Sequence, residues 1–67
     1  MWIRIQDQRL KDSQIVEYKG RSKGMASGLY TIEIKYGRGL KYFKYESEEE
    51  YEKTLSRLDE VLKVQDI

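Results

Sequence analysis

The residues best suited to chemistry in this chain are cations and tyrosines gathered around one glycine-containing turn. Gly37-Arg38-Gly39 predicts a tight hairpin, because two glycines supply the positive φ angles that such a turn needs. Cations that neutralise phosphates and flat rings that stack on bases are the residue types of nucleic-acid binding. A plain solvent-facing sheet or a protein contact uses the same residues. The members of this basic-aromatic group are Lys35, Tyr36, Arg38, Lys41, Tyr42 and Lys44.

A second basic group lies in a glycine- and serine-rich segment. Residues 19–28 contain three glycines and two serines without an apolar period, which predicts a loop. Backbone amides of such a loop can cradle a phosphate, although the spacing of a P-loop is missing. The segment is either a solvated loop or a site for an anionic partner, and its cations are Lys19, Arg21 and Lys23.

Trp2 and Arg4 form a third candidate group. They alternate with Ile3 and Ile5, which predicts a strand with the isoleucines on one face and Trp2 and Arg4 on the other. Tryptophan and arginine are enriched among the residues that dominate protein interfaces. Trp2 therefore either meets a partner or folds over the sheet edge to complete a small core.

Several classes of chemistry have no residues to support them. The chain has no histidine and no cysteine, so it lacks a thiol nucleophile, an imidazole base and a Cys/His zinc site. The glutamates between residues 46 and 52 point in different directions along a helix and do not converge on a divalent cation. We expect no enzymatic activity, no cofactor and no metal site.

The elements that position these groups can be read from spacing. Ser47 followed by Glu50 is a capping box, and it begins a helix predicted over residues 48–64. The apolar stripe of this helix recurs every three or four residues and comprises Tyr51, Leu55, Leu58 and Leu62.

Strands fill the chain before this helix. Alternation over residues 29–36 points Tyr30, Ile32, Ile34 and Tyr36 inward, and residues 40–45 return antiparallel with Phe43 and Tyr45 inward. A turn begins at Asp7-Gln8, and residues 15–18 form a short strand of unsettled facing. The predicted fold is α+β: an antiparallel β-meander of three to four strands with one C-terminal helix packed on one face. The other face is left open, and function is expected there.

Length and charge set the remaining expectations. With 67 residues the chain is a single domain, residues 1–67, and so small a core favours self-association as a homodimer. No apolar run is long enough for a membrane span or a signal peptide, so a cytoplasmic protein without membrane contact is expected. Residues 1–45 carry a net charge of +6 and residues 46–67 carry −5. This asymmetry favours either oriented contacts with charged partners or an acidic helix lying over a basic sheet, with the fields cancelling.

Two short motifs lie at the ends of the chain: Trp2-Ile3-Arg4-x-Gln6-Asp7 at the start, and Tyr45-x-Ser47-x-Glu49 before the predicted helix. They resemble the R-x-Q-D strand and the Y-x-[ST]-x-E helix start of short, mostly unannotated proteins of Gram-positive bacteria and their phages. The likeness covers about the first seven and last twenty residues. It implies the fold given above and a phage or mobile-element origin, and it transfers no activity.

Taken together, these patterns predict a non-catalytic binding domain that acts by occupying a partner protein. In the version that the resemblance implies, it inhibits a host protein. The alternative is a nucleic-acid or nucleotide binder that uses the basic loop and the basic-aromatic hairpin.

Overall fold

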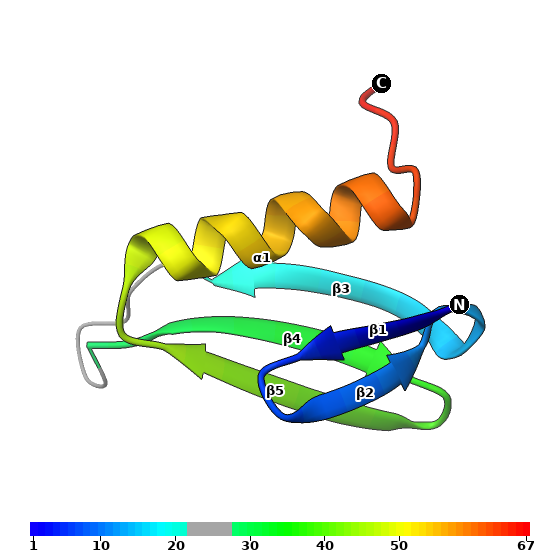
Figure 1. Ribbon diagram of the computed structural model, residues 1–67, viewed down its shortest axis with the longest axis horizontal. Coiled ribbons are helices and arrows are strands. Elements are labelled where there is room, and N and C mark those ends of the chain that lie inside the picture. The colour runs from blue at the N-terminus through cyan, green and yellow to red at the C-terminus, as the bar shows by residue number, and fades with distance from the viewer. Residues whose placement is uncertain (22–27) are drawn as a thin grey trace.

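The computed structural model describes residues 1–21 and 28–67 of the chain. Five strands and a 3-10 helix, η1, precede one α-helix, α1, as Figure 1 shows. In chain order the elements are β1 (Trp2–Ile5), β2 (Gln8–Lys11), η1 (Asp12–Gln14), β3 (Ile15–Arg21), β4 (Tyr30–Tyr36), β5 (Gly39–Tyr45) and α1 (Glu48–Val61).

Strands β3, β4 and β5 form the predicted antiparallel meander. Ile32 of β4 lies opposite Phe43 of β5, and both are buried, as is Ile34. Since residues directly opposite in a sheet share a face, this register confirms the predicted inward set. A bulge between Ile15 and Glu17 interrupts β3 and leaves Val16 exposed.

Helix α1 begins where the sequence predicts. The Oγ of Ser47 accepts a hydrogen bond from the N–H of Glu50 at 3.4 Å, which is the serine half of the capping box. The predicted end at residue 64 is wrong, because the helix stops at Val61. Lys63 takes φ 56° and the N–H of Val64 bonds back to Asp59, which closes the helix with a left-handed cap.

Strand β2 was not predicted from the sequence. It pairs antiparallel with β1 through a two-residue turn. This turn contains no glycine, and Gln6 itself takes the left-handed conformation at φ 54°. Leu10 is the only apolar residue of β2, so the strand has no visible alternation. The turn expected to begin at Asp7-Gln8 is the tip of a hairpin, but it lies one residue earlier, at residues 6–7, and Gln8 already belongs to β2.

The prediction of a loop over residues 19–28 is wrong for its first part. Strand β3 continues to Arg21, and Gly20 on this edge strand pairs with Ile32 of the central strand β4. A Cβ on Gly20 would lie 2.6 Å from Cδ1 of Leu55, so the glycine marks a close approach of α1 to β3. Residues 22–27 lie outside the described part of the chain.

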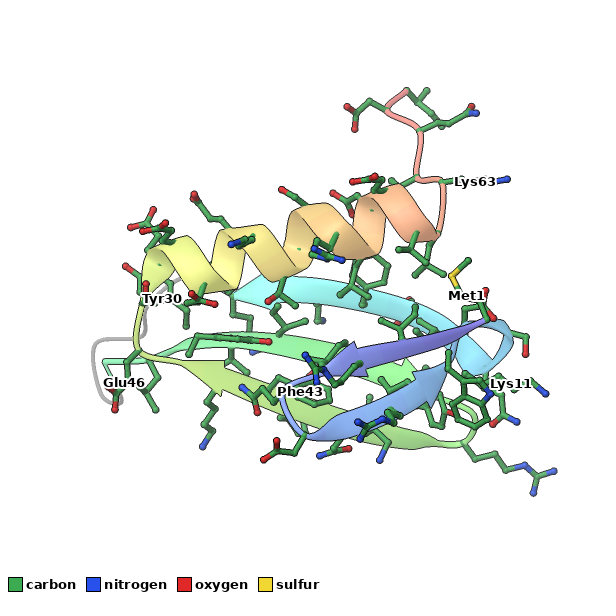
Figure 2. All side chains as sticks on the ribbon, in the orientation of Figure 1. Met1, Lys11, Tyr30, Phe43, Glu46 and Lys63 are labelled. Carbon is green, nitrogen blue, oxygen red and sulfur yellow. The ribbon has the colours of Figure 1, made fainter. Side chains whose placement is uncertain are left out.

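Helix α1 and the β1–β2 hairpin lie on the same side of the meander, and Figure 1 shows the hairpin crossing in front of β4 and β5. One core joins the three parts, and Phe43, labelled in Figure 2, belongs to it. No described element covers the opposite face, in keeping with the α+β prediction. The buried side chains of this core are Ile5, Leu10, Ile32, Ile34, Phe43, Tyr51 and Leu58.

Candidate functional site

The uncovered face of the meander, here called the open face, collects part of the predicted basic-aromatic group. The pairing of β3 with β4 and of β4 with β5 places three rows of side chains on this face, and each row has one residue from each of the three strands. Tyr42 lies at the centre of the open face and is 54% exposed, and Leu40 beside it is 55% exposed. Five predicted site residues belong to this face: Lys19, Arg21, Lys35, Tyr42 and Lys44.

An acidic residue in the middle of the open face weakens it as a phosphate track. Glu33 lies between Lys19 and Tyr42 in one row. Its carboxylate is 3.3 Å from Nζ of Lys19 and 3.6 Å from Nη2 of Arg21. These two cations are therefore partly neutralised within the chain, and the carboxylate would repel a polyanion.

Three other members of the group do not lie on the open face. Lys41 lies opposite Ile34 and so belongs to the inner face, where its Nζ is 5.7 Å from the ring centre of Tyr36. The same Nζ donates to Oε1 of Gln8 at 3.3 Å, which ties β5 to β2. Arg38 is exposed in the turn between β4 and β5. The structure thus divides the basic-aromatic group between two faces and a turn.

The predicted basic loop is also divided. Lys19 and Arg21 are strand residues paired with Glu33, not loop residues around a phosphate. Lys23 falls outside the described residues. The strand position takes Lys19 and Arg21 out of the predicted loop, and residues 22–27, which carry the rest of the phosphate-cradle hypothesis, lie outside the described residues.

A different basic and aromatic surface lies on the outer side of the β1–β2 hairpin. Register places Trp2 opposite Lys11 and Arg4 opposite Arg9, all on the side away from Ile3, Ile5 and Leu10. All four residues are exposed, and Trp2 is 66% exposed, so it does not fold into the core. We call this set, Trp2, Arg4, Arg9 and Lys11, the hairpin face.

The cations of the hairpin face have no carboxylate partner among residues 1–21 and 28–67. The nearby Asp12 accepts from the Met1 amino group at 3.2 Å instead. Like charges directly opposite each other destabilise a sheet. Arg4 and Arg9 therefore face each other without a compensating carboxylate in the described structure, and the hairpin face carries uncompensated positive charge.

Sequence reasoning identified Trp2 and Arg4 but missed Arg9 and Lys11. The missed pair depends on β2, whose single apolar residue gives no period. The one available signal was Leu10 between two cations, which is a short polar-apolar-polar alternation two residues after the turn.

A cleft of about 560 Å³ separates β1 from α1. One wall is β1, and the other is a stripe of α1 that contains Glu50, Thr54, Arg57 and Val61. Tyr45 and the buried Leu58 also line it. Glu50, expected only as a capping residue, is thus part of a surface hollow, and no described hydrogen bond joins its side chain to the Ser47 backbone.

On the other side of the helix, tyrosine hydroxyls join the meander to acidic residues of α1. Tyr18 donates to Oδ1 of Asp59 at 2.6 Å, and Tyr30 donates to Oε2 of Glu48 at 3.2 Å. Desolvation and these bonds raise the pKa of both phenols above the ordinary value. The contacts fasten the acidic helix onto the sheet.

The raised pKa of Tyr18 predicts a loss of stability at alkaline pH. Below the unfolded pKa of about 10 the stabilising contribution is complete. As pH rises further, the unfolded chain releases this proton while the folded chain keeps it, so the free energy of unfolding falls. Tyr18→Phe should flatten this fall between about pH 10 and 12 and cost about 1 kcal/mol at pH 7.

Urea unfolding at a series of pH values measures this effect. Tyr42→Phe serves as the control, since the hydroxyl of Tyr42 makes no hydrogen bond with any described residue. An equally steep decline in wild type and Tyr18→Phe would show that the Tyr18–Asp59 bond does not govern the alkaline limb.

Comparison with family models, with curated proteins and with solved structures found no match for this chain. Within the described ranges there is no group of three or more acidic, histidine or cysteine side chains able to hold a metal. Nor does that part of the chain contain a helix with the length and apolar character needed to cross a membrane. The hairpin face and the adjoining cleft are the features that point to a function.

Proposed function

We propose that this chain is a non-catalytic binding domain that captures an acidic surface of a partner protein with its hairpin face. The observation that carries the proposal is the exposed Trp2 beside cations that lack carboxylate partners in the described structure. A tryptophan buried in an interface supplies apolar contact area, and arginine supplies charge-assisted hydrogen bonds to carboxylates.

A protein partner fits the charge distribution better than a nucleic acid does. The hairpin face offers only three cations, and the open face carries Glu33 at its centre. Glutamates fill the first turn of α1, so a phosphate backbone extending in that direction would meet negative charge. Nucleic-acid domains are usually strongly basic, whereas this chain has a net charge of +1.

The resemblance of the chain ends adds a version of this proposal. In this version the chain is encoded by a phage or mobile element and inhibits a host protein by occupying its surface. Such an action needs a rigid ribbon with an aromatic and charged face, and no reactive group.

The decisive variant is Arg9→Glu. It should weaken partner binding by about tenfold or more, because it removes a cation from the hairpin face and adds an anion. It should also leave the fold as stable or up to about 1 kcal/mol more stable, because the new carboxylate would face Arg4 across the strands. Trp2→Ala should weaken binding to a similar extent.

Proteins captured from extract of the source cell by tagged wild type and variants give the first measurement, and titration of the purified partner gives the second. Lys44→Glu is the matched control, with the same charge change at an exposed strand position on the open face. Loss of binding in Lys44→Glu but not in Arg9→Glu would overturn the proposal. A salt-dependent shift with DNA or RNA that Arg9→Glu abolishes, without a captured protein, would support the nucleic-acid alternative instead.

A further inference from the structure

The outer edge of β1 presents backbone groups that no described residue binds. An antiparallel pair alternates between residues that exchange hydrogen bonds and residues whose N–H and C=O groups point away from the partner strand. The N–H of Asp12 donates to the Met1 carbonyl at 3.0 Å, so Met1 and Asp12 are a hydrogen-bonded pair. The next pair along the strands must then be one whose groups point outward. The N–H and C=O groups of Trp2 and Arg4 therefore point away from β2, toward the open edge.

The two edges of the hairpin differ in this respect. On β2, the outward N–H of Lys11 donates to the hydroxyl of Tyr36 at 2.9 Å, which ties this end of the edge to the meander, while the backbone groups of Arg9 also point outward. On β1, the outward groups of Trp2 and Arg4 have no such partner within the described chain. An unpaired strand edge is a template for another strand.

The cleft between β1 and α1 runs along this unpaired edge. Its volume is about 560 Å³, and every residue of β1 lines it. Side chains of both β1 and α1 line the cleft, so these two elements form its walls. The apolar residues around the cleft include Ile3, Leu58 and Val61. The cleft thus combines hydrogen-bonding groups along one wall with apolar contact area, as strand-addition sites do.

We propose that the partner supplies an extended peptide segment that pairs with the β1 edge inside this cleft. This inference rests on the proposed function, because it names the form in which the partner binds. Alternate side chains of an added strand point to opposite sides, so apolar residues face the cleft at every second position. Arg4 and Arg57 line the cleft and favour acidic residues in the segment, whereas Glu50 disfavours them near its own end.

An extended segment fits better than a folded second copy of this chain. The cleft has α1 as its second wall and a volume of about 560 Å³, which suits a short extended segment and not a folded chain of 67 residues. The chain's own C-terminal residues extend away from the helix in Figure 1, and no residue after Val61 lines the cleft.

Amide hydrogen exchange provides a direct test. Random heptapeptides displayed on a carrier and selected on the wild-type protein supply the probe, which is then synthesised with capped ends. Its binding should slow exchange of the Trp2 and Arg4 amides by at least tenfold. The Ile3 and Ile5 amides, which already bond to β2 in this register, should change far less and serve as the internal control. Binders should alternate apolar with polar or acidic residues.

Two modified molecules separate strand addition from other binding. N-methylation of alternate peptide amides removes the donors that the β1 edge needs and should abolish binding. Thr54→Trp fills the cleft from α1 and should weaken binding at least tenfold, whereas Lys53→Trp, at an exposed position that does not line the cleft, should not.

The opposite results would overturn the inference in distinguishable ways. If Arg9→Glu abolishes partner binding while Thr54→Trp and N-methylation have no effect, the partner contacts the hairpin face without adding a strand, and the proposed function stands. If Arg9→Glu has no effect either, both proposals fail. Protection of the Trp2 and Arg4 amides in the protein alone, with a dimer in sedimentation, would assign the edge to a second copy and overturn the peptide proposal.

Discussion

Gly20→Ala is expected to lower the free energy of unfolding by about 1–3 kcal/mol, although alanine is normally favoured over glycine within a strand. The new Cβ would lie 2.6 Å from Cδ1 of Leu55 and in contact with the hydroxyl of Tyr51. Tyr51 is only 8% exposed, so its ring cannot swing into solvent without opening the core. Urea unfolding measures the change as a lower midpoint at constant m value.

Gly39→Ala is the matched control for this experiment. At Gly39 the nearest heavy atom to a new Cβ is the Tyr36 carbonyl oxygen at 3.9 Å, which is an ordinary contact. This variant should be as stable as wild type or more stable by up to about 1 kcal/mol. Equal stability of Gly20→Ala and Gly39→Ala would contradict the close approach of α1 to β3.

Leu10→Ala is expected to destabilise the protein by about 2–5 kcal/mol, because it leaves a cavity where the hairpin joins the core. Leu10 is 2% exposed and is the only apolar side chain of β2. A single hydrophobic core in a domain of this size rarely supplies more than about 3–5 kcal/mol of stability. The hairpin should therefore detach first, and its amides should lose protection from exchange before those of β3, β4 and β5.

Leu40→Ala removes the same atoms from an exposed position. Leu40 is 55% exposed on the open face, so its truncation should change stability by less than about 0.5 kcal/mol. Partner binding should fall with Leu10→Ala and persist with Leu40→Ala, because the hairpin face requires a docked hairpin. A Leu10→Ala protein with full protection across β1 and β2 would contradict the assigned role of this side chain.

Several elements could be predicted because their signals are local. Ser47 supplies a hydroxyl at the position where a helix has unbonded amides, and the stripe that includes Leu58 turns one side of that helix to the core. Alternation from Tyr30 to Tyr36 separates the two faces of β4. In each case the residues that carry the pattern lie within a few positions of one another.

The errors came from residues whose meaning depends on distant partners. Gly20 indicated a loop by composition, but it sits in a strand because Tyr51 and Leu55 pack where its side chain would be. Gln6 at a positive φ turns the first hairpin without a glycine, and its side-chain amide donates to the Lys44 carbonyl at 3.0 Å. No local pattern contains either contact.

The candidate site also has a part that could be predicted from local sequence and a part that depends on distant residues. Residue type identified Trp2 and Arg4 as interface residues, whereas cross-strand pairing brought Arg9 and Lys11 beside them. Pairing also placed Glu33 among the cations of the open face.

The sequence by itself determined the α+β class, the start of the helix, the inward faces of β4 and β5, and the lack of thiol and imidazole chemistry. Tertiary structure alone decided which cations are neutralised, which are left together on the hairpin, and where a strand edge meets a cleft. The physical reason is the separation along the chain of the residues that interact. Capping and alternation act between near neighbours in the chain, whereas charge compensation and edge exposure depend on residues that only folding brings together.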